Sequence, residues 1–167
     1  MRRRQVDTTK KTIILFSGDF DKVMAALIIA NGASAMGDDV TIFCTFWGLN
    51  ILRKTGGPRS KGGGKKTMLQ SMFGRMMPKG TRKLGLSKMN FAGAGAPLMR
   101  KATKDVGGMS LEDLFESARE QGVKFVACTL SMDTLGFRKE ELIEGIEYAG
   151  VASYLGEADE ANVNLFI

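Results

Sequence analysis

The chain contains no histidine, and this absence removes several kinds of chemistry at once. A Ser-His-Asp or Cys-His arrangement, a histidine general base and a histidine-ligated metal are all excluded. Any nucleophile in this protein must therefore be activated by lysine, arginine, a helix dipole or backbone amides.

Cysteine is scarce as well, because the 167 residues include only Cys44 and Cys128. Two cysteines so far apart make no disulfide framework, and the chain has no CxxC pair, so we expect a reducing cytoplasm. Without histidine the two thiols do not suggest a zinc site, and we expect neither a metal nor a cofactor.

Long apolar runs are missing too. No stretch approaches the roughly 20 apolar residues that a membrane span needs. The run Ile13 to Phe16, which follows the basic N-terminus, is too short for a signal peptide. We expect a soluble, cytoplasmic protein whose membrane contact, if it has one, is peripheral.

Acidic residues are absent from a central segment. Residues 53–104 contain fourteen basic residues and no acidic one, whereas residues 105–167 contain thirteen acidic and four basic residues. A basic block of this kind favours an acidic partner, such as an anionic membrane surface or the acidic face of a neighbouring subunit. Nucleic acid is not favoured, because the block offers only Phe73 and Phe91 for base stacking.

The same block contains a stripe of methionines at helical spacing, Met68, Met72 and Met76. Such a stripe fits an adaptable protein contact or shallow seating in a membrane. Plain core packing explains it equally well.

Short apolar runs alternate with helical patterns over most of the chain, which predicts an α/β fold with a doubly wound, mainly parallel five-stranded sheet. We expect strands at 12–16, 39–46, 123–127, 151–155 and 163–167, helices at 22–36, 110–121 and 138–148, and a short helical turn at 157–161. Residues 1–167 are expected to form a single domain in which 1–11 are flexible. Residues 53–108 are expected to be a basic, Met-rich, partly helical insertion, with a helix at 67–77.

Cys128 follows the buried run Val123 to Ala127 directly, and small polar residues follow it in turn. The carboxyl end of a parallel strand is where open α/β sheets place their ligands. Unpaired backbone N–H groups there favour an anion, which for cysteine is its own reactive thiolate. The alternative is that Cys128 is a small buried hydrophobe, and position alone does not separate the two.

Four motifs define a resemblance: Leu15-Phe-Ser-Gly-Asp19, Phe43-Cys-Thr-Phe-Trp-Gly-Leu49, Ala127-Cys-Thr-Leu-Ser-Met-Asp133 and Gly150-Val-Ala-Ser-Tyr-Leu-Gly-Glu157. With them, essentially the whole chain resembles the DsrE/DsrF-like sulfur-relay family, in particular its DsrE-type, peroxiredoxin-like subfamily. The resemblance implies a DsrEFH- or flavodoxin-like α/β domain in a homo-oligomer, a trimer or hexamer. It also implies a sulfurtransferase-like carrier that holds sulfane sulfur as a cysteine persulfide.

By this resemblance Cys128 matches the sulfur-accepting cysteine, and Cys44 is a second cysteine typical of the subfamily. The implied partners are sulfur donor and acceptor proteins of rhodanese-like or TusA-like type. The long basic insertion departs from the pattern of the best-studied relay proteins.

The residues themselves lead to a similar site. We expect the first strand to lie between the two cysteine strands, so that both sulfurs reach one carboxyl edge about 10 Å apart. The amides of Ser17, Gly18 and Asp19 would line the space between them, with Thr129 and Ser131 completing the anion-stabilising set. Thiolate attack on a persulfide needs no histidine.

The prediction is therefore a sulfur carrier with Cys128 as acceptor and Cys44 assisting or resolving. Two alternatives stay open. One is a non-catalytic membrane- or partner-binding module that uses the basic Met-rich segment. The other is a flavin- or nucleotide-binding module of flavodoxin type.

Overall fold

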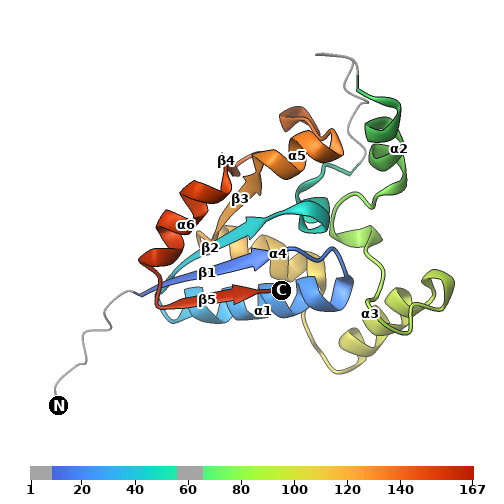
Figure 1. Ribbon diagram of the computed structural model, residues 1–167. Helices are drawn as coiled ribbons and strands as arrows, with labels where there is room; N and C mark the ends of the chain where they lie inside the picture. The colour runs from blue at the N-terminus through green and yellow to red at the C-terminus, as the bar shows by residue number, and fades with distance from the viewer. Residues whose placement is uncertain (1–8, 56–65) are drawn as a thin grey trace.

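A five-stranded parallel sheet forms the centre of the computed structural model, which describes residues 9–55 and 66–167 (Figure 1). The strands are β1 (Lys10–Leu15), β2 (Asp39–Cys44), β3 (Lys124–Cys128), β4 (Glu147–Ala149) and β5 (Val163–Phe166). Their order is β4-β3-β2-β1-β5, and all neighbours run parallel. This confirms the predicted fold class.

Helices cover both faces of the sheet. α1 (Phe20–Ala35) and α4 (Leu111–Glu120) pack against each other on one face, and α6 (Val151–Asp159) crosses the other (Figure 1). The steps from β1 to β4 move in one direction along the sheet, and α6 returns the chain over the opposite face to β5. Right-handed crossovers that move the chain in opposite directions along a sheet must pass over opposite faces, as the helices do here.

The predicted strand order was wrong. We expected β1 to lie between the two cysteine strands β2 and β3, but these two strands are direct neighbours and β1 lies on the other side of β2. The crossover from β2 to β3 continues outward through α4 instead of returning past β1. The apolar runs that identified the strands contain no information on this choice, because each is buried on both faces.

Three helices lie where they were predicted, and each has a clear local signal at one end. Ser110 caps α4 by accepting a hydrogen bond from the backbone N–H of Asp113. α2 (Met68–Met76) begins with a full capping box between Thr67 and Gln70. α1 ends just before Gly37, whose φ of 91° is favourable only for glycine.

The segment 138–155 was predicted incorrectly. The expected helix 138–148 is a short 3₁₀ turn, Lys139–Glu141, followed by β4. The expected strand 151–155 is the first half of α6, which ends at Asp159, within the turn expected at 157–161. Leu142 is buried and pairs in an antiparallel bridge with Arg53, which holds its backbone extended. Gly145 has a positive φ that a continuous helix would not allow.

α5 (Thr129–Leu135) also begins directly after Cys128, earlier than expected. β1 begins at Lys10, so the expected flexible segment 1–11 overlaps the sheet, and its residues 1–8 lie outside the described residues.

The basic segment lies beyond the carboxyl ends of the strands, with α2 and α3 (Gly95–Asp105) along one side of the molecule (Figure 1). Two arginines attach it. The buried Arg53 donates hydrogen bonds to the carbonyls of Met77, Pro78 and Gly74 at 2.8–3.1 Å. Arg100 binds both carboxylate oxygens of Glu112 on α4 and the carbonyl of Thr81.

Among the described residues, no helix combines the length and the apolar character that crossing a bilayer would require.

Candidate functional site

Cys128 is the last residue of β3 and the N-cap residue of α5. β3 has neighbours on both sides, and Cys128 pairs in register with Ala149 of β4. Its side chain packs with Phe43, Val126 and Tyr154 under α6, and 5% of the residue is exposed. The first N–H groups of a helix have no acceptor within it, so backbone donors follow this sulfur directly.

The hydroxyls expected around Cys128 already have partners. Ser131 and Thr45 share a hydrogen bond between their side-chain oxygens at 2.7 Å, which links α5 to the segment after β2. Thr129 donates a longer bond of 3.4 Å to the carbonyl of Ala149. Ser131 and Thr129 therefore attach the first turn of α5 to the ends of β2 and β4, the two strands beside β3.

Cys44 ends β2 at the same edge of the sheet but points to the opposite face. It pairs in register with Ala127, and both lie in the core beneath α1 and α4, whereas Cys128 belongs to the cluster beneath α6. Cys44 is fully buried, and this burial raises the pKa of its thiol strongly. Both thiols are free. The two sulfurs share an edge as predicted, but the sheet lies between them.

The turn Ser17-Gly18-Asp19 does not lie between the cysteines. It follows β1, which β2 separates from β3. Within it, Ser17 Oγ donates to Asp19 Oδ2 at 3.0 Å, and Lys22 Nζ lies 3.1 Å from the same oxygen. The expectation that these amides line a space between the two sulfurs is therefore wrong, because the strand order places the turn away from both cysteines.

This turn instead lines a separate cleft of about 400 Å³ at the carboxyl end of β1. Its lining residues are Phe16, Ser17, Gly18, Asp19, Lys22, Trp47, Asn50, Pro78 and Gly85. Neither cysteine is among them. One wall of the cleft comes from the 3₁₀ helix Phe46–Leu52, which closely approaches the end of β1.

Gly48 makes that approach possible. A Cβ atom on Gly48 would lie 2.0 Å from the carbonyl oxygen of Leu15. This steric clash excludes every residue other than glycine at this position. Gly48 N–H also donates to the carbonyl of Phe16 at 3.0 Å. These contacts hold Trp47 and Asn50 against the turn after β1.

The sequence reasoning missed Lys22, Trp47 and Asn50. Trp47 was visible in the motif after the second strand, but nothing indicated which way it would face. Asn50 had a clearer signal, because it interrupts the apolar run Leu49-Asn-Ile-Leu52. A buried polar residue in such a run usually has a specific partner.

No group of three or more histidine, cysteine, aspartate or glutamate side chains that could hold a metal ion occurs in the described part of the chain.

The chain belongs to the DsrE/DsrF/DrsH-like family, whose model matches residues 7–166.

Two curated relatives match along nearly their whole length. The chain is 55% identical over 160 residues to the uncharacterized protein YrkE of Bacillus subtilis, covering 96% of this chain and 98% of that protein. It is 34% identical over 166 residues to the sulfur carrier protein DsrE2 of Allochromatium vinosum, covering 97% and 100%. Among solved structures, the E. coli YchN protein matches with a TM-score of 0.52 at 14% identity, covering 96% of this chain and 100% of that one, which shows a shared fold.

Proposed function

We propose that this protein is an intracellular sulfur carrier that holds sulfane sulfur as a persulfide on Cys128. The observation that carries the proposal is the place of Cys128 at the end of β3, directly before the backbone donors of α5. The 34% identity to a protein named a sulfur carrier supports it. Main-chain donors favour an anionic sulfur without any help from histidine.

Loading is a thiol exchange that needs no oxidant. The Cys128 thiolate attacks the outer sulfur of a donor persulfide, and a new S–S bond forms on Cys128. The donor's own S–S bond breaks, and the donor leaves as a thiol with the proton. Unloading is the same step with an acceptor thiol as the attacking group.

Relay partners of rhodanese-like or TusA-like type would have to approach Cys128 through its immediate surroundings. Three exposed apolar side chains lie on the elements beside it: Leu130 in the first turn of α5, and Val151 and Leu155 one turn apart on α6. Exposed apolar residues that gather in this way are typical of protein contacts. We infer that they form the rim on which a donor docks.

Cys44 has a packing role in this proposal instead of the resolving role that the sequence suggested. It lies on the other face of the sheet, is fully buried and has a raised pKa, so it remains a protonated thiol. Two thiols that point apart in this way cannot form a disulfide without backbone movement.

Exposure to polysulfide followed by intact-mass measurement tests the function. We expect the wild-type protein to gain about 32 Da, the mass of one sulfur atom, and to lose it on treatment with a reducing thiol. A protein that gains no such mass is not a carrier of sulfane sulfur.

A homo-oligomer, a trimer or hexamer, stays a prediction. Its best candidate contact is a group of partly exposed aromatic side chains at the edge of the sheet, Phe16, Phe46 and Phe166. The ring centroids of Phe16 lie 5.6 Å and 5.8 Å from those of Phe46 and Phe166. Exposed aromatic clusters of this kind are enriched at protein interfaces.

A second candidate function rests on a different surface, the basic segment. Met68 and Met76 on α2 are 94% and 75% exposed, so the methionine stripe is not core packing. Apart from the buried Arg53, six cations of the same segment make no ion pair within the described residues: Arg75, Lys79, Arg82, Lys83, Lys88 and Lys104. We infer that this surface contacts an anionic membrane surface peripherally, since that partner matches both its charge and its apolar side chains.

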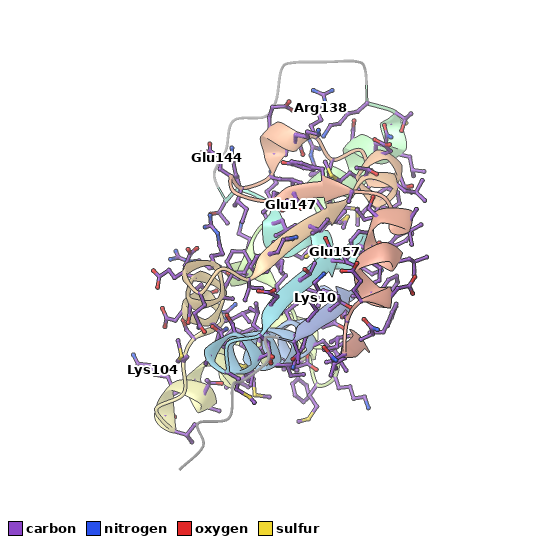
Figure 2. All side chains as sticks on the ribbon, turned by 90° about the vertical axis from the view of Figure 1, so that its left-hand side faces the viewer. Lys10, Lys104, Arg138, Glu144, Glu147 and Glu157 are labelled. Atoms are coloured by element: carbon purple, nitrogen blue, oxygen red, sulfur yellow. The ribbon has the colours of Figure 1, made fainter. Side chains whose placement is uncertain are left out.

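Four other cations of the segment are paired with carboxylates, those of Glu144, Glu141, Glu112 and Asp105, so the six unpaired cations carry the net positive charge of this surface. Figure 2 shows Glu147 and Glu157 on the β4 and α6 side of the molecule, away from Lys104. Glu147 and Glu157 lie 4.0 Å and 3.4 Å from Lys124 Nζ on β3.

Sedimentation with vesicles tests this second function on the full chain. We expect binding to vesicles that contain phosphatidylserine, loss of binding at high salt, and none to pure phosphatidylcholine. An Arg82→Glu/Lys83→Glu protein should bind at least about tenfold more weakly, since each cation near the surface contributes about 1 kcal/mol.

Methionine variants separate the apolar contribution. Met68→Ser/Met76→Ser should weaken binding, whereas Met36→Ser, which replaces an equally exposed methionine at the end of α1, should not. Equal binding by all of these proteins would leave the membrane contact without support.

A further inference from the structure

The side-chain hydroxyls of Thr45 and Ser131, beside Cys128, have one more proton than their mutual hydrogen bond uses. We propose that Thr45 donates this proton in a hydrogen bond to the outer sulfur of a persulfide on Cys128, and that Ser131 positions the Thr45 hydroxyl. The inference rests on the proposed carrier function and adds to it a residue that contacts the stored sulfur. Three observations carry it: the strand register, the number of hydroxyl protons and the difference in burial between the two hydroxyl residues.

The strand register places Thr45 next to Cys128 at the carboxyl edge of the sheet. Cys44 pairs with Ala127 in the parallel ladder between β2 and β3, so the next residues of the two strands lie side by side. Thr45 is extended, with φ −130° and ψ 154°, and its N–H donates to the carbonyl of Leu15 at 3.0 Å. Side chains of an extended chain alternate between the two faces. Because Cys44 faces the α1 side, Thr45 faces the α6 side, as Cys128 does.

The two hydroxyls form a single hydrogen bond but carry two protons. Their oxygens lie 2.7 Å apart, so one hydroxyl donates to the other. Each hydroxyl has one proton to donate. Neither is hydrogen-bonded to any further group in residues 9–55 and 66–167, so the second proton has no acceptor there.

Burial decides which residue carries the second proton. Ser131 is 1% exposed, whereas Thr45 is half-buried at the edge of the sheet. A spare proton on Ser131 would be an unsatisfied donor in the interior, which is costly. Ser131 therefore donates to Thr45, and the Thr45 hydroxyl keeps a proton for a further acceptor. Accepting a hydrogen bond also polarises a hydroxyl and makes it a better donor.

A persulfide on Cys128 supplies that acceptor. The bare thiol caps no amide of α5, and neither hydroxyl is bonded to it. Loading adds a second sulfur at the length of an S–S bond, about 2.05 Å, and so extends the side chain beyond its buried position. The outer sulfur is anionic when ionised, and a charged acceptor strengthens a hydrogen bond. Thr45 then contacts sulfur in the loaded protein only.

A contact made only in the loaded protein favours retention of the sulfur. When a small thiol takes the cargo, it attacks the outer sulfur and forms a new S–S bond with it. The S–S bond to Cys128 breaks, and Cys128 leaves with the electron pair and takes the proton of the attacking thiol. The hydrogen bond from Thr45 stabilises one side of this equilibrium alone, so its loss shifts the equilibrium toward the unloaded protein.

Equilibrium loading of the full-length protein measures this contact. The protein is incubated with glutathione and glutathione persulfide at fixed ratios, and intact mass after alkylation gives the fraction of chains that carry one extra sulfur. We expect Thr45→Val, and independently Thr45→Ala, to lower the equilibrium constant for loading at least about tenfold. Thr45→Ser keeps the hydroxyl and should restore most of the loading.

Two further variants separate a contact with the sulfur from a structural role. Ser131→Ala removes the same hydrogen bond as Thr45→Val, so both should lower the melting temperature similarly, but Ser131→Ala keeps the donor and should lower loading less. Thr134→Val removes a hydroxyl that donates to the carbonyl of Leu130 farther along α5, and it should load like the wild type. Equal loading by the wild type and Thr45→Val, or an equal loss in Thr45→Val and Ser131→Ala, overturns the inference alone. A wild-type protein that takes up no sulfur overturns the proposed carrier function as well.

Discussion

A Cys128→Ser protein should gain no sulfur from polysulfide, whereas a Cys44→Ala protein should gain as much as the wild type. A serine hydroxyl cannot form the S–S bond that stores the sulfur. The Cys44 thiol stays protonated, since burial raises its pKa, and no donor can reach it in the folded chain. Intact mass gives the occupancy, and peptide mapping gives its position.

This pair of variants is a matched control, because each removes one of two free thiols from the end of neighbouring strands. Sulfur found on Cys44 in the Cys128→Ser protein would show that the sheet does not protect it. A full adduct with equal yield in both variants would contradict the assignment of Cys128. We expect both variants to fold, since serine and alanine are similar to or smaller than cysteine.

Arg53→Ala should lower the free energy of unfolding by about 3 kcal/mol or more. Arg53 is 3% exposed, and its guanidinium bonds to three backbone carbonyls and lies 4.3 Å from the ring centroid of Phe137. Its removal leaves those carbonyls without their donor in a buried place. For a chain of this size we expect the melting temperature to fall by roughly 6–12 °C.

Arg82→Ala is the control, because Arg82 belongs to the same basic segment but is exposed and makes no ion pair among the described residues. Its free energy of unfolding should change by no more than about 0.5 kcal/mol. Arg53→Lys should recover little of the loss, since an ammonium cannot reach three carbonyls in a fixed fork. Equal stability of the Arg53→Ala and Arg82→Ala proteins would show that Arg53 does not hold the segment in place.

The sequence allowed the fold class and several helices to be predicted because their signals are local. The capping residues Thr67 and Ser110 act on backbone groups within four residues, so they can be recognised without knowing the rest of the structure. Segment 138–155 failed because its apolar residues fit helix and strand equally. Tertiary contacts decide there: Arg53 forms a β-bridge with Leu142, and Tyr154 is the one residue of α6 that is buried.

The candidate site was predicted in part for a similar reason. The end of a buried strand marked Cys128, and the structure places it there. The relative direction of the two sulfurs was beyond prediction, because strands buried on both faces show no alternation that would tell one face from the other. The strand order then moved Ser17 and Asp19 away from the thiols and into the cleft with Asn50.

The separation of the two thiols by the sheet also limits what such a carrier can do alone. If Cys128 holds a persulfide as proposed, the chain has no second thiol on the same face of the sheet to which that sulfur could pass. Discharge is then a bimolecular event whose rate rises with the concentration of the acceptor. Because the two thiols lie on opposite faces of the sheet, oxidation cannot join them within the folded chain, and a persulfide on Cys128 would persist until an acceptor thiol arrives.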